Sequence, residues 1–227
     1  MNKNYKCLSK QLFSNEEYSI LPIRKEDRYD IMKWRNEQIY HLRQDKLLTK
    51  EDQDKYFNDV VSVLFEKEQP NQILFSYLKD DKCIGYGGLV HINWLDKNAE
   101  ISFVMETKLE NEYFEFHWSN FLGLIENVAF EEIRLHKIYT YAFDLRPKLY
   151  KSLNNKNFEK EALLKDHCFF ENDFIDVIIH SKINKFKYRT ALINDIEILF
   201  KWANEEGVRN NALNKSPIKW EQHVKWF

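Results

Sequence analysis

Hydrophobic and polar residues alternate over the middle of the chain in a way that predicts three short strands. Residues 73–79, 82–94 and 99–105 are each rich in β-branched and aromatic side chains, and short polar turns separate them. Turns this short join antiparallel neighbours. The pattern therefore predicts a β-meander.

Apolar repeats on both sides of the meander indicate helices. In residues 56–65 apolar side chains recur at i, i+1, i+4, i+5, i+8 and i+9, which is one face of a helix. Thr49 and Asp52 form a start for that helix that is similar to a capping box. Further helices are predicted from about residue 28, over residues 114–133 and from Pro147, and further strands over residues 18–23, 138–143, 158–165 and 174–183.

The predicted element order is β-α-α-β-β-β-α-β-α-β-β. Strands that follow one another directly pair antiparallel, whereas strands joined through a helix can pair in parallel. We therefore expect a fold of the α/β (α+β) class, with a mixed, mostly antiparallel sheet and helices on both of its faces.

The C-terminal part of the chain repeats its N-terminal part. The pattern K-W-x-N-E occurs at residues 33–37 and again at residues 201–205. Residues 51–57 (E-D-Q-D-K-Y-F) then align with residues 221–227 (E-Q-H-V-K-W-F) after a two-residue insertion. Two patterns in the same order at nearly the same separation favour an internal repeat, and two unrelated amphipathic helices are the alternative.

We interpret residues 1–183 as one domain and residues 184–227 as the incomplete N-terminal segment of a second copy. We expect one strand and two helices in this segment, which is too short to bury its apolar faces by itself. Trp202, Trp226 and Phe227 are therefore expected to be either disordered or buried. The covering surface would belong to the first domain or to another chain, as in a homodimer.

Composition and charge narrow the class of protein. The formal net charge of −2 argues against nucleic-acid binding as the main function. The three cysteines lie far apart without CxxC spacing, and the histidines show no metal-ligand spacing, so no disulfide framework or metal site is expected. No signal peptide and no apolar run of about 18 residues is found, so we expect a cytoplasmic protein without a membrane span.

Three glycines lie within one predicted strand. Gly85, Gly87 and Gly88 occur in C-I-G-Y-G-G, inside residues 82–94. Glycines inside a strand more often mark a bulge or a close approach of two backbones than a phosphate loop. We favour this structural interpretation.

Four segments resemble the GNAT family of N-acetyltransferases, in particular its branch of ribosomal-protein and amino-sugar acetyltransferases. They are A-E-I-S-F-V-M (99–105), L-H-K-I-Y-T-Y-A (135–142), L-Y-K-S-L-N-N-K-N-F-E-K-E-A (149–162) and F-I-D-V-I-I-H-S (174–181). The C-terminal patterns N-E-x-x-x-R and E-x-H-x-K-W-F are similar to the start of sugar-nucleotide N-acetyltransferases of bacterial surface-glycan synthesis. The resemblance implies a splayed central strand pair, acetyl-coenzyme A as co-substrate and a small amine acceptor, for which a nucleotide-linked amino sugar is the candidate.

The resemblance also implies where the co-substrate binds. In the family, acetyl-coenzyme A enters a gap between two parallel strands, which here are residues 99–105 and 138–143. Backbone groups of Phe103, Val104 and Met105 would then hydrogen-bond the pantetheine arm.

One residue matches a catalytic position of the family, and a second is a candidate because it starts the strand that flanks the gap. Tyr150 aligns with the tyrosine that protonates the departing thiolate, and Glu100 is the candidate general base for the amine. Packing beside Leu149 is the alternative explanation for Tyr150. A solvated strand end is the alternative for Glu100.

The region that should bind the pyrophosphate departs from the family pattern. Residues 106–117 contain no glycine and four glutamates, where the family has a glycine-rich loop. Acidic side chains there satisfy the helix dipole that a pyrophosphate would otherwise use. Lys108 and Arg146, with Lys148, are the candidate phosphate contacts. Two functions thus stay open, an active N-acetyltransferase and a non-catalytic binding or scaffold domain of the same fold.

Overall fold

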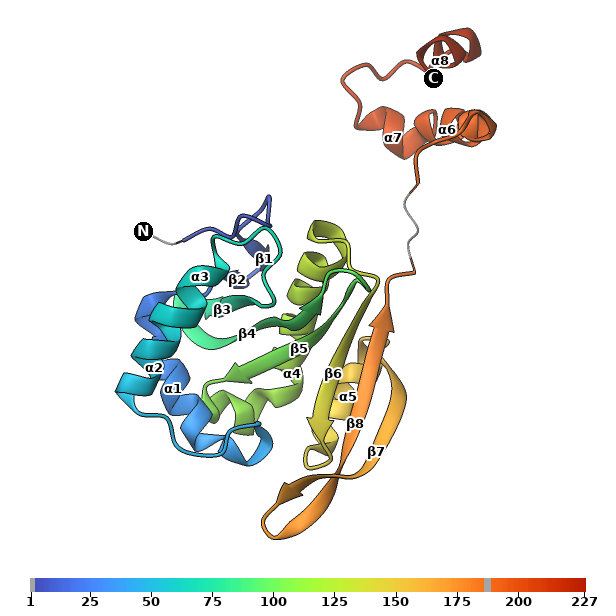
Figure 1. Cartoon of the computed structure of the whole chain (residues 1–227). Helices are drawn as coiled ribbons and strands as arrows, with labels where there is room; N and C mark the ends of the chain where they lie inside the picture. The colour runs from blue at the N-terminus through green and yellow to red at the C-terminus, as the bar shows by residue number, and fades with distance from the viewer. Residues whose placement is uncertain (1–2, 186–188) are drawn as a thin grey trace. The chain divides into compact units, whose positions relative to one another are not determined.

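The chain forms two compact units that divide at about residue 184 (Figure 1). The structure is a computed structural model that describes residues 3–185 and 189–227. Unit 1 precedes the division and unit 2 follows it, and each is described by itself.

Unit 1 is built on one sheet of eight strands in the order β1-β2-β3-β4-β5-β6-β8-β7. The pair β5/β6 is parallel, and the other neighbouring pairs are antiparallel. The strands are β1 (Phe13–Asn15), β2 (Tyr18–Pro22), β3 (Ile73–Lys79), β4 (Lys82–Asn93), β5 (Asn98–Met105), β6 (Lys137–Phe143), β7 (Glu159–Phe170) and β8 (Asp173–Ile183).

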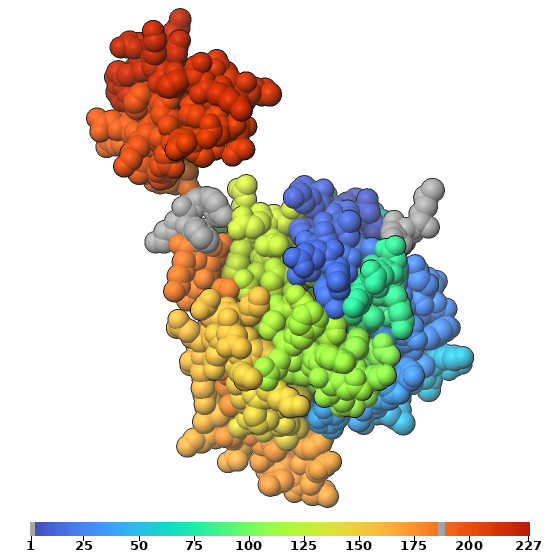
Figure 2. Space-filling view, turned by 180° about the vertical axis from the view of Figure 1, so that it is seen from behind, coloured from blue at the N-terminus to red at the C-terminus, as the bar shows by residue number. Residues whose placement is uncertain are grey.

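Helices cover both faces of this sheet. One face carries α1 (Arg28–Glu37), α2 (Lys50–Tyr56) and α3 (Ser62–Leu64), and the opposite face, seen in Figure 2, carries α4 (Thr107–Glu126) and α5 (Pro147–Asn155). Short helical turns extend these elements: η1 (Lys25–Asp27), η2 (Ile39–His41), η3 (Phe57–Val61) and η4 (Asn127–Glu132). This architecture confirms the predicted fold class.

The core on the α4 face is built from aromatic side chains. Phe103 of β5 stacks on Phe121 of α4, with ring centroids 4.0 Å apart, and Trp118 packs edge-on against Phe103. Burying a side chain of this size contributes about 1.5–3 kcal/mol. These contacts fix α4 against the strand that borders the candidate site.

The predicted capping box at the second helix is confirmed. Thr49 accepts a hydrogen bond from the backbone N–H of Asp52, and the Asp52 carboxylate accepts one from the backbone N–H of Thr49. Both ends of the motif satisfy amides that the first turn of a helix leaves unpaired.

The predicted start of the long helix at residue 114 was wrong, because α4 begins at Thr107. The prediction followed the apolar repeat, which starts at Phe114. Residues 107–113 contain neither glycine nor proline, and their glutamates favour a helix N-terminus electrostatically. A break in the helical backbone at Tyr113 (φ −129°, ψ 28°) separates the two parts.

The structural interpretation of the strand glycines is confirmed at two positions. A Cβ atom on Gly87 would lie 2.2 Å from the carbonyl oxygen of Ser102, and one on Gly88 would lie 2.0 Å from that of Ile73. No side chain fits at such distances. The glycines let β4 lie close to both of its neighbours.

Unit 2 contains η5 (Ile193–Asp195), α6 (Ile196–Ala203), α7 (Glu206–Asn210) and α8 (Trp220–Trp226). The strand expected before α6 falls partly on residues 186–188, which lie outside the described residues, and residues 189–192 form no strand. Trp202 and Trp226 lie on formed helices and are 51% and 79% exposed. Neither side chain is buried within unit 2, so the expected cover by another surface stays a prediction.

Within residues 3–185 and 189–227, no helix has both the length and the apolar character that crossing a membrane requires.

Candidate functional site

The parallel strands β5 and β6 separate shortly after they begin. They pair at Asn98–Lys137, Ala99–Ile138 and Glu100–Tyr139, and not beyond. After that point β5 stays with β4 and β6 stays with β8, and the two halves of the sheet diverge.

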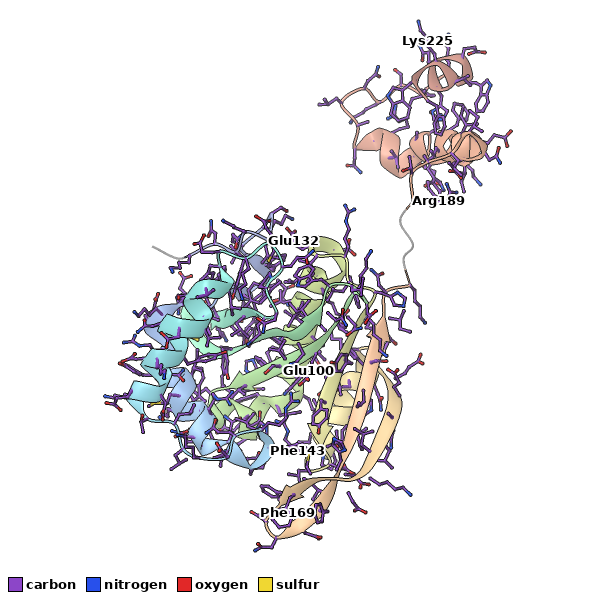
Figure 3. All side chains as sticks on the ribbon, in the orientation of Figure 1. Glu100, Glu132, Phe143, Phe169, Arg189 and Lys225 are labelled. Atoms are coloured by element: carbon purple, nitrogen blue, oxygen red, sulfur yellow. The ribbon has the colours of Figure 1, made fainter. Side chains whose placement is uncertain are left out.

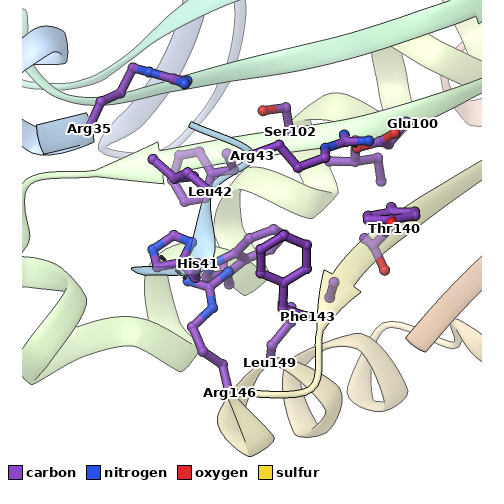
Figure 4. A pocket seen from close by; sticks show the side chains of 15 residues that line it. Arg35, His41, Leu42, Arg43, Glu100, Ser102, Thr140, Phe143, Arg146 and Leu149 are labelled. Carbon is purple, nitrogen blue, oxygen red and sulfur yellow. Dashed lines mark hydrogen bonds and ion pairs between the residues drawn. The ribbon is translucent and has the colours of Figure 1, made fainter. Parts of the chain in front are cut away.

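A cavity of about 200 Å³ opens at this fork (Figure 4). We call it the fork cavity. It is lined by Arg35, His41, Leu42, Arg43, Glu100, Ile101, Ser102, Phe103, Trp118, Thr140, Tyr141, Ala142, Phe143, Arg146 and Leu149. The cavity lies between the expected strand pair, so the predicted gap is present.

Glu100 lies at the base of the fork (Figure 3). Its side chain is 7% exposed and forms an ion pair with Arg43, whose guanidinium also lies 4.6 Å from the ring centroid of Tyr141. Burial raises the pKa of the Glu100 carboxyl, and the positive charge of Arg43 opposes that rise. A buried carboxylate with a raised pKa has the properties of a general base.

A second cavity, of about 480 Å³, adjoins the fork cavity. We call it the sheet-face cavity. It shares Arg43, Glu100 and Tyr141 with the fork cavity and is also lined by His91, Lys137, Tyr139, Glu161, Ala162 and Ile179. Glu100 therefore faces two spaces that could hold two reactants.

Two buried polar atoms of the fork cavity's lining residues lack a partner. The indole N–H of Trp118 and the hydroxyl of Thr140 have no hydrogen-bond partner among the described residues. Such atoms cost roughly 1–3 kcal/mol each when they stay unsatisfied. A bound molecule with polar groups would offer them partners.

Arg146 closes the opposite end of the fork cavity. Its Nη1 donates to Glu110 Oε1 at 2.9 Å and lies 3.4 Å from Nε2 of His41. Burial and the charge of Arg146 lower the pKa of His41 to about 3, so His41 is neutral. On its outer side, Arg146 also borders a third cavity of about 240 Å³, lined by Tyr40, Glu110, Asn111, Phe114, Leu145, Pro147 and Lys148, which we call the outer cavity.

Tyr150 does not line the fork cavity. Its ring stacks on His180 with centroids 5.2 Å apart, and its hydroxyl donates to Oδ1 of Asp144 at 2.8 Å. Burial, followed by the hydrogen bond and charge of Asp144, raises the pKa of Tyr150. The tyrosine thus keeps its proton at neutral pH, with the hydroxyl held by Asp144.

Of the other residues predicted to bind the co-substrate, some line the fork cavity and some do not. Phe103 lines the fork cavity, whereas Val104 and Met105 do not. The carbonyl of Met105 accepts a hydrogen bond from the side chain of Gln38 at 2.8 Å. Lys108 is exposed on the first turn of α4.

Sequence reasoning missed Arg43, Tyr141 and Glu110. Arg43 lies between two helices, in a segment with no recognisable motif, and meets Glu100 only through the fold. Glu110 was counted among the acids of a loop rather than as a buried partner of Arg146. The sequence did offer one signal for the first of these. Arg43 is a single arginine after the first helix and Glu100 a single glutamate in an apolar strand, and opposite charges of this kind can pair.

In residues 3–185 and 189–227, no group of three or more His, Cys, Asp or Glu side chains is arranged to hold a metal ion.

Comparisons with known proteins place this fold among acetyltransferases. Residues 20–179 match the family described as acetyltransferase (GNAT) domain. The structure of spermidine N-acetyltransferase from Vibrio cholerae in complex with CoA and spermine is similar to this chain with a TM-score of 0.66 and 16% identity, covering 74% of this chain and 96% of that one.

Two more solved structures show the same fold. A dodecameric structure of spermidine N-acetyltransferase from Vibrio cholerae has a TM-score of 0.61 at 17% identity, over 74% of this chain and 95% of that one. A probable acetyltransferase has a TM-score of 0.61 at 17% identity, over 77% and 97%. The family match spans most of unit 1, including both strands of the fork, and the chain therefore belongs to the GNAT family of acetyltransferases, whose co-substrate is acetyl-coenzyme A.

Proposed function

We propose that this chain transfers an acetyl group from acetyl-coenzyme A to the primary amine of a small acceptor at the β5/β6 fork. The observation that carries the proposal is the position of Glu100, which borders both the fork cavity and the sheet-face cavity. The unpartnered Trp118 and Thr140 groups suit the amide-bearing pantetheine arm, with Phe103 beside it.

In this proposal Glu100 accepts a proton from the acceptor amine, which would lie in the sheet-face cavity. The amine nitrogen forms a bond with the acetyl carbon, and the bond from that carbon to sulfur breaks. The leaving thiolate takes up one proton, which matches the proton that the amine loses to Glu100. Holding the two reactants on either side of Glu100 supplies the orientation that such a direct attack needs.

Tyr150 is the proposed proton donor for the thiolate. It keeps its proton at neutral pH, but its hydroxyl has to exchange Asp144 for the sulfur. We therefore expect Tyr150→Phe to lower kcat by about 10²-fold, at the weak end of general acid catalysis, with little change in co-substrate binding. An unchanged kcat would remove Tyr150 from the mechanism.

We propose a nucleotide-linked amino sugar as the acceptor. The sheet-face cavity has two carboxylates, and each is already paired: Glu100 with Arg43, and Glu161 with Lys137. A polyamine needs free carboxylates, whereas phosphate and hydroxyl oxygens accept hydrogen bonds from arginine and lysine. In this proposal the anionic group of the acceptor would replace a carboxylate as the partner of Arg43 or Lys137.

Two measurements test the proposal. Calorimetry with acetyl-coenzyme A should give heat of binding, and a thiol-release assay should give turnover with a nucleotide-linked amino sugar above that with the free amino sugar or spermidine. Folded protein that gives no heat at high micromolar concentration would instead support a non-catalytic binding or scaffold domain. Faster turnover with spermidine would contradict the acceptor class.

We also propose that residues 184–227 begin a second copy of the fold. In unit 1 the Asn36 side chain clamps Leu48: its Nδ2 donates to the carbonyl of Leu48 at 2.9 Å and its Oδ1 accepts from the Leu48 N–H at 2.8 Å. In unit 2 Asn204 makes the same two bonds to Ile218, at 3.2 and 2.7 Å. Both asparagines belong to the repeated K-W-x-N-E pattern.

A second pair of matching bonds supports the duplication. Gln53 Nε2 donates to the carbonyl of Arg28 at 2.9 Å, and Nε2 of His223 lies 2.9 Å from the carbonyl of Ile196. Gln53 and His223 are 3% and 4% exposed. The aligned positions therefore perform the same local task although the residue type differs.

The two copies differ in what covers them. Trp34 is 5% exposed in the core of unit 1, and its counterpart Trp202 is 51% exposed. We propose that a partner chain, a second copy of this protein, covers the exposed face of α6 and α8. Sedimentation should detect a dimer that Trp202→Glu dissociates, and a chain that is monomeric at all concentrations would contradict this contact.

A further inference from the structure

We propose that Arg146 binds the phosphates of the acyl donor and that Glu110 holds the Arg146 guanidinium until the donor arrives. The inference rests on the proposed acetyl transfer. Glu110 lies in the region where the family has its glycine-rich loop. We give this glutamate a role at the place where the phosphates of the donor would bind.

Arg146 lies where the fork cavity and the outer cavity meet. Arg146 lines both the fork cavity and the outer cavity, so its side chain separates them. Figure 4 shows it reaching from the end of β6 towards His41. An elongated donor whose thioester lies in the fork cavity and whose phosphates lie outside must pass this side chain.

The ion pair between Glu110 and Arg146 is buried. The side chains of Glu110 and Arg146 are 7% and 15% exposed. Taking two charges out of water costs several kcal/mol per ion unless each is well paired. Arg146 can therefore leave Glu110 only for another anion, and Glu110 must then reach water. A phosphate can replace the carboxylate, because its oxygens also accept charge-assisted hydrogen bonds from a guanidinium.

The groups around the pair favour an anion once Glu110 withdraws. Lys148 lines the outer cavity on the same side, His41 is neutral, and the Phe114 ring centroid lies 5.3 Å from the guanidinium carbon of Arg146. Glu110 is thus the one carboxylate among the described lining residues of the outer cavity. Its departure leaves two cations facing that space.

A break in the backbone of α4 lies just after Glu110. The break at Tyr113 separates the first turns of the helix, which carry Glu110, from the part that packs through Phe121. In this proposal the Glu110 side chain moves while the stack of Phe103 on Phe121 stays in place.

Glu110→Gln tests the proposal. The substitution removes the competing charge, so we expect the Kd for coenzyme A to fall about tenfold, which corresponds to 1.4 kcal/mol. Acetyl-pantetheine, which lacks the phosphates, should bind as in the wild type. Arg146→Gln should weaken coenzyme A binding by about tenfold and again leave acetyl-pantetheine unchanged.

Glu115→Gln is the matched control. Glu115 lies on the same helix, pairs with Lys151 on the surface and lines none of the three cavities. We expect its Kd for coenzyme A to equal that of the wild type. A tenfold gain in this variant too would indicate a general charge effect and overturn the proposal.

The possible outcomes are distinct. Absence of coenzyme A binding by the wild type would refute the proposed function itself. Binding by the wild type with no gain in Glu110→Gln would refute only the role of Glu110, and would identify the pair as a structural contact. If Glu110→Gln does not fold, Glu110→Asp is the second variant, because it keeps the charge on a shorter side chain. Its affinity for coenzyme A should exceed that of the wild type. An unchanged or lower affinity would overturn the proposal.

Discussion

Glu100 and Glu110 are both buried carboxylates paired with an arginine, but Glu100 lines the fork cavity whereas Glu110 lines the outer cavity. Each side chain is 7% exposed, but the partners differ: Arg43 is 47% exposed and Arg146 is 15% exposed. Arg43 can leave its glutamate for water, whereas Arg146 can leave only for another anion. In our proposal the same pair of residue types serves proton transfer at Glu100 and co-substrate binding at Arg146.

The difference arises from where each pair lies in the fold. Glu100 is on β5 where the strands part, and Arg43 reaches it from the segment before α2. Glu110 is on the first turn of α4, and Arg146 precedes α5. Burial raises the pKa of both carboxyls and the arginines oppose that rise, so titration alone does not separate the two roles. Substitutions can.

The largest effect is expected for Glu100→Gln. Removing the proposed general base should lower kcat/KM by about 10²–10³-fold. The Kd for acetyl-coenzyme A should stay close to that of the wild type, because Glu100 lies away from the phosphate end. Steady-state kinetics and calorimetry on the same sample measure both quantities. A loss of affinity equal to the loss of activity would make Glu100 a binding group and remove the contrast with Glu110.

Loss of the arginines should have unequal effects on stability. Arg146→Ala leaves a buried carboxylate without its partner and should lower the free energy of unfolding by about 3 kcal/mol. Arg43→Ala should lower it by less, because His91 Nε2 stays 3.9 Å from the Glu100 carboxylate after Arg43 is removed. Urea denaturation of both variants checks the difference. Equal losses would mean that the exposure of the partner does not distinguish the two pairs.

The pH dependence of activity should report Glu100. The base acts in its ionised form, so kcat/KM should fall as pH drops through the raised pKa of Glu100. In Arg43→Gln the opposing positive charge is gone, and this acid limb should move to higher pH. Arg146→Gln should leave the limb in place. The same raised pKa makes ionised Glu100 destabilising, so its contribution to stability is present at low pH and lost as pH rises through that pKa.

The smallest effect is expected at Thr140, which shows what a buried polar group costs without any partner. Its hydroxyl is unsatisfied among the described residues, so Thr140→Val should raise the free energy of unfolding by about 1 kcal/mol. If the hydroxyl serves the co-substrate, affinity for acetyl-pantetheine should fall in the same variant. Higher stability with unchanged affinity would remove Thr140 from the binding site.

Much of the fold could be read from local patterns. The meander, the helices of unit 1 and the capping box at Thr49 follow from periodicity and short-range hydrogen bonding, and these depend on neighbours in sequence. The start of α4 was missed because it rests on helix-favouring acidic residues rather than on an apolar repeat. The repeated K-W-x-N-E pattern was also visible, and its asparagines make matching bonds in both units.

The sequence by itself determined the fold class, the family resemblance and the place of Glu100 at the strand that borders the gap. Only the tertiary structure decided which groups meet there: Arg43 with Glu100, Arg146 with Glu110, and Tyr150 with Asp144 rather than with the fork cavity. The physical reason is the range of the forces involved. Periodicity reflects burial along one element, whereas an ion pair depends on two side chains that distant segments bring within a few ångströms.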